Sequence, residues 1–232
     1  MTVNHQGDPT KPPVLLLHGG AGPRSMAGLA DALTADRHVL TPTHPGFEGT
    51  DRPEWMDTVA DMADAYLDLL DDLDLNDVLV VGNSVGGWIA AEMALRDNHT
   101  RLKGLVLLNA VGTAGEITDL RALTPPEIAA LAFTNPANAQ QLQTPHQPAN
   151  QQTLAIYAGD PYMHDPKLHR RLARVRLPVQ VLWGEDDQVV TPTYGQALAD
   201  AFPSATFQLV DHAGHFPQIE RLDAVVEAIE KF

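Results

Sequence analysis

Short apolar runs alternate with amphipathic stretches along most of the chain. The runs are rich in Val and Leu and are bounded by Pro, Gly, Asn or Asp, which is typical of strands buried on both faces. The clearest helical stretch lies between about residues 57 and 73, where apolar side chains recur at spacings of three and four. Six buried strands are expected, at residues 14–17, 39–40, 78–81, 105–108, 179–183 and 207–210.

Strands that alternate with helices in this way predict an α/β fold, in which helices cover both faces of a mostly parallel sheet. The core is expected to comprise residues 1–111 and 178–232. Residues 112–177 contain no evident core strand, and we interpret them as an insertion over one edge of the sheet, with helices at 125–133 and 166–175. Residues 135–152 are crowded with Asn, Gln, Ala and Pro and are expected to order poorly.

The composition is that of a globular protein with one domain. The chain has 232 residues, 44% of them hydrophobic, which is enough for a sizeable core. No window holds 18 unbroken apolar residues, so a membrane-spanning helix is excluded. Residues 1–13 lack the basic start and apolar run of a secretory signal, so a cytoplasmic protein is expected.

Charge and cysteine content narrow the function classes. The 30 acidic residues outnumber the 15 basic ones and give a formal net charge of −15. Such a surface repels nucleic acid and anionic lipid, so we expect neither as a partner and expect a small-molecule substrate instead. Cysteine is absent, which excludes disulfides, thiolate zinc sites and a cysteine nucleophile.

The strongest chemical signal is the sequence Gly-Asn-Ser-Val-Gly at residues 82–86, between an expected strand and an expected helix at 88–95. This is the G-x-S-x-G nucleophile elbow in the context that it requires. Ser84 would occupy a strained turn that exposes its hydroxyl, and side chains at 82 and 86 would collide with the neighbouring strand and helix. The alternative is a glycine-rich turn that only packs a helix on a strand.

A serine hydroxyl needs a base to become nucleophilic, and the base needs an acid to orient it. After an elbow of this kind, the acid and then the histidine follow in the chain. Glu185, Asp186 and Asp187 follow the expected strand at 179–183, at the carboxyl end where catalytic residues lie in open α/β sheets. The residue types alone leave all three open as the acid.

Two histidines follow the last expected strand, His212 and His215. Gly214 allows a sharp bend that would turn the next residue back over the sheet, which favours His215 as the base. His212 is then a surface or supporting residue. The spacing of these histidines also fits a pair of metal ligands, but no third ligand is evident, so we expect no metal site.

A fourth element is the sequence Leu-His-Gly-Gly-Ala-Gly-Pro at residues 17–23. A loop so rich in glycine frees backbone N–H groups to converge on an anion, such as the oxyanion formed in acyl transfer. We assign the two donors to the N–H groups of Gly20 and Val85. A phosphate-binding loop is the alternative, but neither glycine pattern of nucleotide-binding folds is present. His18 is expected to support the loop without taking part in the chemistry.

Together these residues resemble the serine-nucleophile branch of the α/β-hydrolase superfamily over nearly the whole chain. The sequence His-Pro-Gly-Phe-Glu-Gly-Thr-Asp at 44–51 is similar to the family's glycine-rich loop after the next strand. The family's acid usually stands three residues after a glycine, which selects Asp187 after Gly184. Gly214 and His215, with Glu220 downstream, resemble the histidine loop of the family.

The resemblance implies a central sheet of six to seven strands flanked by helices, with a small helical lid at 112–177. Family members usually carry two strands before the one at 14–17, and only 13 residues precede it here. Whether residues 2–6 supply an edge strand stays open. Residues in the lid and beside the histidine are expected to line an apolar substrate pocket, namely Phe133, Leu142, Ile156, Tyr157, Tyr162, Met163 and Phe216.

The family resemblance implies a catalytic triad of Ser84, Asp187 and His215 that needs no cofactor and no metal. Dehalogenases and epoxide hydrolases of this fold use Asp at the elbow, so Ser84 argues against both. We expect a serine hydrolase of small, largely apolar carboxylic esters. One alternative is a hydrolase of carbon–carbon bonds in meta-cleavage-type diketone acids, since Phe216 follows His215 where those enzymes carry an aromatic residue. Another is a ligand-binding or receptor protein with little turnover.

Overall fold

The computed structural model describes residues 1–232 and contains one seven-stranded sheet with the strand order β1-β3-β2-β4-β5-β6-β7. All neighbouring strands are parallel except β1, which pairs antiparallel with β3 at one edge. The mostly parallel sheet is therefore confirmed, strands form at all six expected positions, and the N-terminal edge strand is present. The expectation of burial was wrong for the last strand, at 205–210, because it lies at the other edge of the sheet and only Val210 in it is buried. The strands are β1 (Thr2–Gln6), β2 (Pro13–Leu17), β3 (His38–Thr43), β4 (Val78–Asn83), β5 (Leu102–Leu108), β6 (Val179–Gly184) and β7 (Ala205–Val210).

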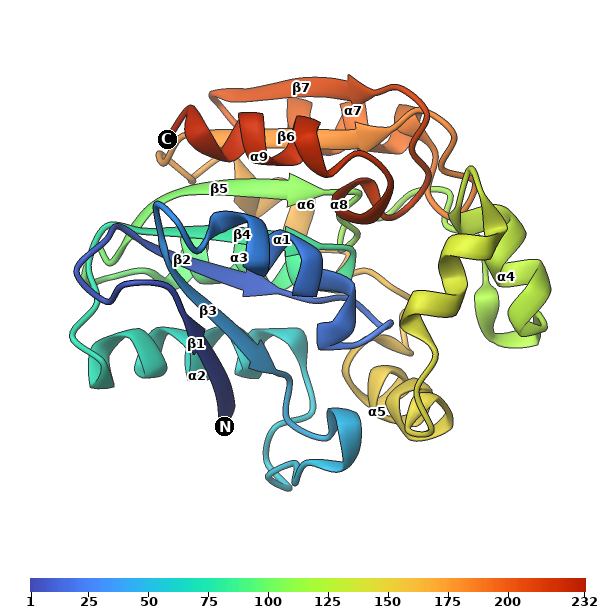
Figure 1. Ribbon diagram of the computed structural model, residues 1–232, viewed down its shortest axis with the longest axis horizontal. Coiled ribbons are helices and arrows are strands. Elements are labelled where there is room, and N and C mark those ends of the chain that lie inside the picture. The colour runs from blue at the N-terminus through green and yellow to red at the C-terminus, as the bar shows by residue number, and fades with distance from the viewer.

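Alternate side chains of the buried strands enter two different core layers. Val14 and Leu16 of β2 pack with the helices on one face, whereas Leu15 and Leu17 join the larger cluster on the other. This is why the apolar runs are continuous along each strand. Helices α1 (Ala27–Leu33) and α9 (Leu222–Glu230) cover the first face (Figure 1). The second face packs against α2 (Val59–Asp72), α3 (Val85–Arg96), α6 (Leu168–Leu172) and α7 (Pro192–Asp200).

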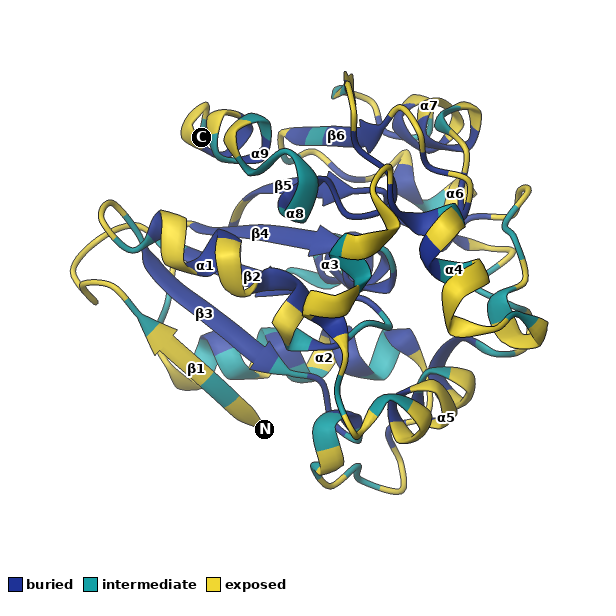
Figure 2. Cartoon of the chain, turned by 45° about the vertical axis from the view of Figure 1, so that its right-hand side comes forward, coloured by how far each residue is buried: buried dark blue, intermediate teal, exposed yellow.

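Burial follows the same pattern (Figure 2). The inner strands are buried along most of their length, whereas the edge strand β1 is largely exposed. The last short helix of the core, α8 (Pro217–Glu220), leads into α9. No helix is both long enough and apolar enough to cross a bilayer.

Within the segment 112–177, α4 (Pro125–Ala132) and α5 (Gln147–Ala158) lie beyond the carboxyl ends of the strands, past the arrowheads in Figure 1. Its last helix, α6, packs on the second face of the sheet instead. The helix expected at 125–133 is confirmed, and the one expected at 166–175 is shorter, since α6 covers only Leu168–Leu172. Short 3-10 turns complete the segment: η3 (Leu120–Ala122) and η4 (Pro136–Leu142).

The expectation that residues 135–152 would order poorly is wrong, because η4 and the start of α5 lie within them. Several polar side chains in and just after this stretch are hydrogen-bonded to the loop after β3. Asn150 is fully buried, its Nδ2 donates to Glu48 Oε1 over 2.6 Å, and its Oδ1 accepts from the Glu48 N–H over 2.8 Å. The Thr153 hydroxyl donates to the Gly46 carbonyl over 3.0 Å. The expectation was based on the small apolar area of these residues and did not include such hydrogen bonds.

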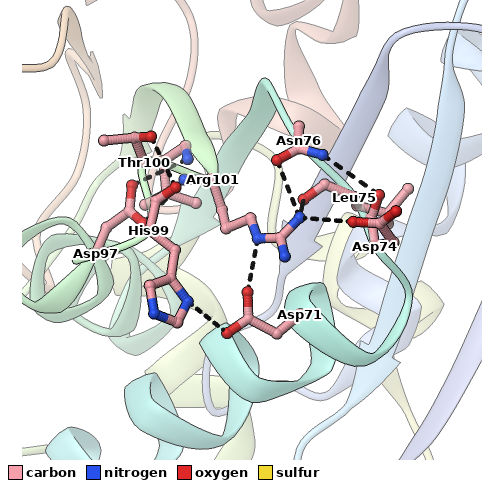
Figure 3. A network of polar contacts seen from close by, with 9 residues as sticks. Asp71, Asp74, Leu75, Asn76, Asp97, His99, Thr100 and Arg101 are labelled. Atoms are coloured by element: carbon pink, nitrogen blue, oxygen red, sulfur yellow. Dashed lines mark hydrogen bonds and ion pairs between the residues drawn. The ribbon is translucent and has the colours of Figure 1, made fainter.

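At the opposite end of the sheet, Arg101 joins three neighbouring segments (Figure 3). Its Nε donates to Asp71 on α2 over 2.6 Å, and its Nη1 donates to Asp74 over 3.1 Å and to Asn76 over 2.9 Å. His99 contacts the second oxygen of Asp71 over 2.8 Å. Because β4 and β5 begin at residues 78 and 102, this network fastens the amino ends of the central strands.

Candidate active site

Ser84 lies in the turn between β4 and α3, with φ 55° and ψ −120°. A non-glycine residue with positive φ is strained, and such strain is common where a side chain must be presented for function. The two glycines of the motif permit the turn. A Cβ at Gly82 would lie 2.3 Å from the Gly86 carbonyl oxygen, and one at Gly86 would lie 2.1 Å from that of Leu17. The collisions expected from the sequence are therefore real.

Asp187 and His215 form a buried pair. His215 Nδ1 lies 2.8 Å from Asp187 Oδ2, and the two residues are 5% and 2% exposed. The other carboxylate oxygen, Oδ1, accepts from the N–H groups of Val189 over 2.8 Å and Val190 over 3.1 Å. When Nδ1–H of the neutral imidazole donates to Asp187, Nε2 is left as a proton acceptor. His215 and Ser84 line the same cavity.

The other acids and the other histidine lie elsewhere. Asp186 is exposed and accepts a hydrogen bond from the Thr134 hydroxyl over 3.1 Å, and Glu185 is exposed as well. His212 is exposed with φ 56°, in the turn before Gly214. No group of three or more His, Cys, Asp or Glu residues is placed to hold a metal ion. Of the alternatives left open by residue type, the structure pairs Asp187 with His215.

Two asparagines hold this pair, and sequence analysis assigned a role to neither. Asn109 is fully buried directly after β5; its Nδ2 donates to Asp187 Oδ2 over 2.7 Å, and its Oδ1 accepts from the Gly184 N–H over 3.2 Å. Asn83 Nδ2 donates to the His215 carbonyl over 3.0 Å. Both residues lie at the carboxyl end of a central strand, which is the signal that could have identified them.

Glu220 connects the histidine loop to the segment over the cavity. Its carboxylate accepts from the Gly214 N–H over 2.8 Å and from the N–H groups of Thr134 and Asn135 over 3.2 and 3.1 Å. The His215 N–H in turn donates to the Ala132 carbonyl at the end of α4 over 2.7 Å. The loop that carries His215 is thus fastened to the turn after α4.

The glycine-rich loop after β2 is held from behind by His18, as expected. His44 N–H donates to His18 Nε2 over 3.1 Å, so His18 carries its proton on Nδ1 and donates to the Gly19 carbonyl over 2.7 Å. His44 Nε2 donates to the His18 carbonyl over 2.8 Å, and its Nδ1 accepts from the Tyr66 hydroxyl over 2.5 Å. The bond accepted by His18 Nε2 requires a neutral His18, and the bond accepted by His44 Nδ1 requires a neutral His44.

Burial favours that neutral state. It lowers the pKa of His44 to about 4 and lowers the pKa of His18 well below its usual value. Gly19 lies so close to the elbow that a Cβ would come within 2.8 Å of Ser84 Cβ. Gly20 and Val85 line the same cavity as Ser84.

The cavity has a volume of about 280 Å³ and a mostly apolar wall. Of the residues expected to line it, Tyr162, Met163 and Phe216 do so. Most of the remaining wall comes from the segment 112–177, through residues that sequence analysis did not single out. These are Ile117, Leu120, Arg121, Leu123, Ile128, Ala132, Gln147, Gln151, Leu154, Ala155, Ala158 and Gly159.

The expectation was wrong for the other lid residues. Phe133 is buried behind the wall, where its ring stacks on that of Phe216 with centroids 4.9 Å apart. The Tyr157 hydroxyl donates to the Pro45 carbonyl over 3.0 Å, on the side of α5 that packs on the loop after β3. Leu142 is buried outside the cavity wall, and Ile156 is 46% exposed. Of the large side chains of α5, Leu154 therefore lines the cavity, whereas Ile156 and Tyr157 do not.

One cation, Arg121, lies in the cavity wall and is already engaged. It donates to both carboxylate oxygens of Asp119, with Nη2 2.6 Å from Oδ2, and its guanidinium lies 4.5 Å from the centroid of the Tyr162 ring. The hydrogen bonds from Arg121 lower the pKa of Asp119 to about 2. The pair is neutral as a whole at pH 7.

Comparisons with known proteins agree with this architecture. The model of the alpha/beta hydrolase family matches residues 14–228. The chain is 26% identical over 253 residues to a 2-hydroxy-6-oxo-2,4-heptadienoate hydrolase of Pseudomonas putida, covering 95% of this chain and 88% of that protein. It is 28% identical over 250 residues to a pimeloyl-(acyl-carrier protein) methyl ester esterase of Aromatoleum aromaticum, covering 95% and 97%. A solved meta-cleavage product hydrolase from Pseudomonas fluorescens IP01 has the same fold, with a TM-score of 0.80 at 22% identity over 99% of this chain and 92% of that one.

Proposed function

The chain belongs to the alpha/beta hydrolase family of enzymes, and from that premise we propose that it is a serine hydrolase of small, largely apolar carboxylic esters. In this proposal Ser84 is the nucleophile, His215 the base and Asp187 the acid that orients the base. The observation that carries the proposal is the buried Asp187–His215 pair on the same cavity as the strained Ser84.

The reaction proceeds in two halves. His215 Nε2 takes the hydroxyl proton while Ser84 Oγ attacks the ester carbonyl, and the tetrahedral anion is held by the N–H groups of Gly20 and Val85. Asp187 stabilises the imidazolium that forms. The alcohol then leaves with the proton from His215, which gives an acyl-enzyme. Water attacks this intermediate with its proton passing to His215, and the acid is released as Ser84 regains its hydrogen.

We propose further that residues 112–177 act as a lid that shapes the acyl pocket. Support comes from their position past the strand ends and from the share of the cavity wall that they contribute. The apolar wall favours an aliphatic or aromatic acyl chain over a charged one. A charged chain loses its hydrating water on entering the cavity, and apolar side chains offer no hydrogen bonds in exchange.

A reactive-serine probe tests the assignment directly. We expect a fluorophosphonate to label the wild type but not the Ser84→Ala variant. Wild type that has first reacted with unlabelled fluorophosphonate should not be labelled either. The wild type should also hydrolyse p-nitrophenyl esters of short and medium acyl chains. Labelling without turnover on a broad ester panel would favour a ligand-binding protein and contradict the proposal. Absence of labelling with the protein folded would contradict the role of Ser84.

Hydrolysis of a carbon–carbon bond is the second candidate. It is favoured by the likeness to the Pseudomonas putida heptadienoate hydrolase and by the presence of Arg121 in the cavity wall, where a guanidinium could meet a carboxylate. The neutralising contact with Asp119 opposes it. The two candidates separate on a coloured ring-fission diketone acid, whose disappearance is followed by absorbance. A kcat/KM on this acid far above that on simple esters would reverse the ranking.

A further inference from the structure

One side chain of α5 contacts the glycine-rich loop after β2. A Cβ added to Gly20 would lie 2.7 Å from Leu154 Cδ2 and 3.9 Å from Leu154 Cγ, and no atom of another residue beyond the chain neighbours would lie within 4 Å of it. Leu154 is partly buried and lines the cavity together with Gly20, Ser84 and Val85. Leu154 alone therefore limits the space on this side of Gly20.

Buried hydrogen bonds hold Leu154 against that loop. Thr153, the residue before Leu154, is buried, and its hydroxyl donates to the Gly46 carbonyl over 3.0 Å. Two residues before Gly46, the buried His44 donates through Nε2 to the His18 carbonyl over 2.8 Å. α5 and the glycine-rich loop are thus fastened to the same short segment after β3. The helix that carries Leu154 cannot retreat from the loop without breaking one of these bonds.

The contact with Leu154 lies beside the centre of the proposed reaction. When Ser84 Oγ adds to the ester carbonyl, the carbonyl carbon becomes tetrahedral and its oxygen meets the proposed donors, the N–H groups of Gly20 and Val85. The first carbon of the acyl chain is one bond from this centre. A methyl branch on that carbon has to keep about 3.5–4.0 Å from the methyl groups of Leu154. A branch further along the chain lies farther from Gly20 and is not subject to the same limit.

We propose that Leu154 is a specificity-determining residue that excludes branching at the first carbon of the acyl chain. The substrate class is a carboxylic ester whose acyl chain is unbranched beside the carbonyl, with branches tolerated further along. The inference rests on the proposed ester hydrolysis and on the proposed acyl pocket of the lid. Apolar pockets distinguish substrates that differ by a single methylene by about tenfold or more, so a steric limit at this carbon is measurable.

The test compares p-nitrophenyl pentanoate with its isomer p-nitrophenyl pivalate, in which all the branches are on the first carbon. The two esters differ in intrinsic reactivity, so the readout is the change in their ratio of kcat/KM between wild type and variant. Leu154→Ala should lower the preference for the pentanoate by about tenfold. Leu154→Val, a smaller change that disturbs the packing of α5 less, should lower the preference in the same direction.

Ile156→Ala is the matched control, because Ile156 lies on the same helix, is 46% exposed and is not part of the cavity wall. It should keep the wild-type ratio and the wild-type kcat/KM. A second substrate pair, p-nitrophenyl hexanoate and p-nitrophenyl tert-butylacetate, moves the same branch one carbon away from the carbonyl. Leu154→Ala should change the ratio of this pair much less. An unchanged pivalate ratio in the folded Leu154 variants, or an equal change for both pairs, would overturn the role of Leu154.

A labelling measurement separates this inference from the proposed turnover. Fluorophosphonates with an n-butyl or a tert-butyl group on phosphorus form a tetrahedral adduct when Ser84 Oγ displaces fluoride, and the adduct need not be hydrolysed. Leu154→Ala should lower the preference for the n-butyl reagent by about tenfold, and Ile156→Ala should leave it unchanged.

The outcomes of the two measurements are distinguishable. If the reagents react but no ester is cleaved, the proposed function fails, and the labelling rates still decide on Leu154. If esters are cleaved and neither ratio changes in Leu154→Ala, the role of Leu154 alone fails. If the folded protein reacts with neither reagent and cleaves no ester, both proposals fail.

Discussion

Asn109 and His215 bind the same carboxylate oxygen. Asn109 Nδ2 lies 2.7 Å and His215 Nδ1 lies 2.8 Å from Asp187 Oδ2, while Oδ1 is held by two backbone N–H groups. All these donors stabilise the ionised form of the carboxylate and fix the plane in which His215 can meet it. In the proposed mechanism, Asn109 is thus a positioning residue for Asp187 and, through it, for His215.

We expect Asn109→Asp to lower kcat for ester hydrolysis by about tenfold or more. The variant replaces the amide donor to Asp187 Oδ2 with a carboxylate that repels it, so Asp187 no longer holds His215 in one orientation. Asn76→Asp, at the far end of the sheet, is the control and should keep the wild-type kcat. Steady-state kinetics on one p-nitrophenyl ester measures both variants, and an unchanged kcat in Asn109→Asp would contradict the positioning role.

Neighbouring acids on one loop allow a matched test of the triad. We expect Asp187→Asn to lower kcat on the order of 10⁴-fold, because the imidazole loses the partner that sets its tautomer and stabilises its charge. Asp186→Asn changes the same charge one residue earlier and should retain most of the activity, since Asp186 is exposed and binds only Thr134. Steady-state kinetics on one p-nitrophenyl ester measures both. Equal losses in the two variants would exclude Asp187 as the specific acid.

The neutral pair His18 and His44 makes the fold sensitive to acid. A histidine whose pKa is lowered in the folded state binds fewer protons there than in the unfolded chain, so stability falls as pH drops below about 6.5 and continues to fall toward the folded pKa. For His44, with a folded pKa of about 4, lowering the pH from 7 to 5 should reduce the free energy of unfolding by about 2 kcal/mol. Urea denaturation at the two pH values measures this, and His44→Gln should show a flatter dependence.

Replacing glycine by alanine should change stability in opposite directions at Gly86 and Gly28. Gly86→Ala should destabilise the protein by several kcal/mol or prevent folding, because the new Cβ would lie 2.1 Å from the rigid backbone oxygen of Leu17. Gly28→Ala, in α1 with no atom within 4 Å of the added Cβ, should stabilise it by about 0.5–1 kcal/mol through helix propensity. Thermal denaturation of both variants measures the contrast. A tolerated Gly86→Ala would contradict the packing of the elbow on β2.

The network of Arg101 concerns stability and not activity. We expect Arg101→Gln to lower the melting temperature at low salt, and by less at high salt, with kcat/KM unchanged. The reason is that three segments at the amino ends of β4 and β5 lose their common donor, remote from the cavity. Arg174→Gln, at an exposed arginine, serves as the control. Loss of activity without loss of stability would contradict this assignment.

The elements that could be predicted from the sequence are those whose physics is local. The buried strands could be predicted because a short continuous apolar run is typical of a strand buried on both faces. The elbow could be predicted because the glycines on both sides of Ser84 form a known motif between a strand and a helix. The ordered structure of α5 could not be predicted from the sequence. It depends on hydrogen bonds from Asn150 and Thr153 to a loop about a hundred residues earlier, and amino-acid composition does not reveal such partners.

The same limit applies to the site. The chain order of Ser84, Asp187 and His215 follows from a known pattern, but the choice of wall residues depends on how α5 is turned about its axis. Because Tyr157 bonds to the Pro45 carbonyl, Tyr157 lies off the cavity wall, and α5 contributes Leu154, two alanines and two glutamines to that wall. Asn109 was missed for a related reason, since an asparagine after a strand becomes informative only when its partners across the sheet are known.

The cover over the cavity is fastened at two unrelated places. The turn after α4 is tied through Glu220 to the loop of His215, whereas α5 is tied through Asn150 to Glu48 beyond β3. The His215 N–H donates to the Ala132 carbonyl at the end of α4, so a change in the position of α4 also affects the loop of His215. A change in α5 acts first on the loop after β3, to which Asn150 and Thr153 bind it.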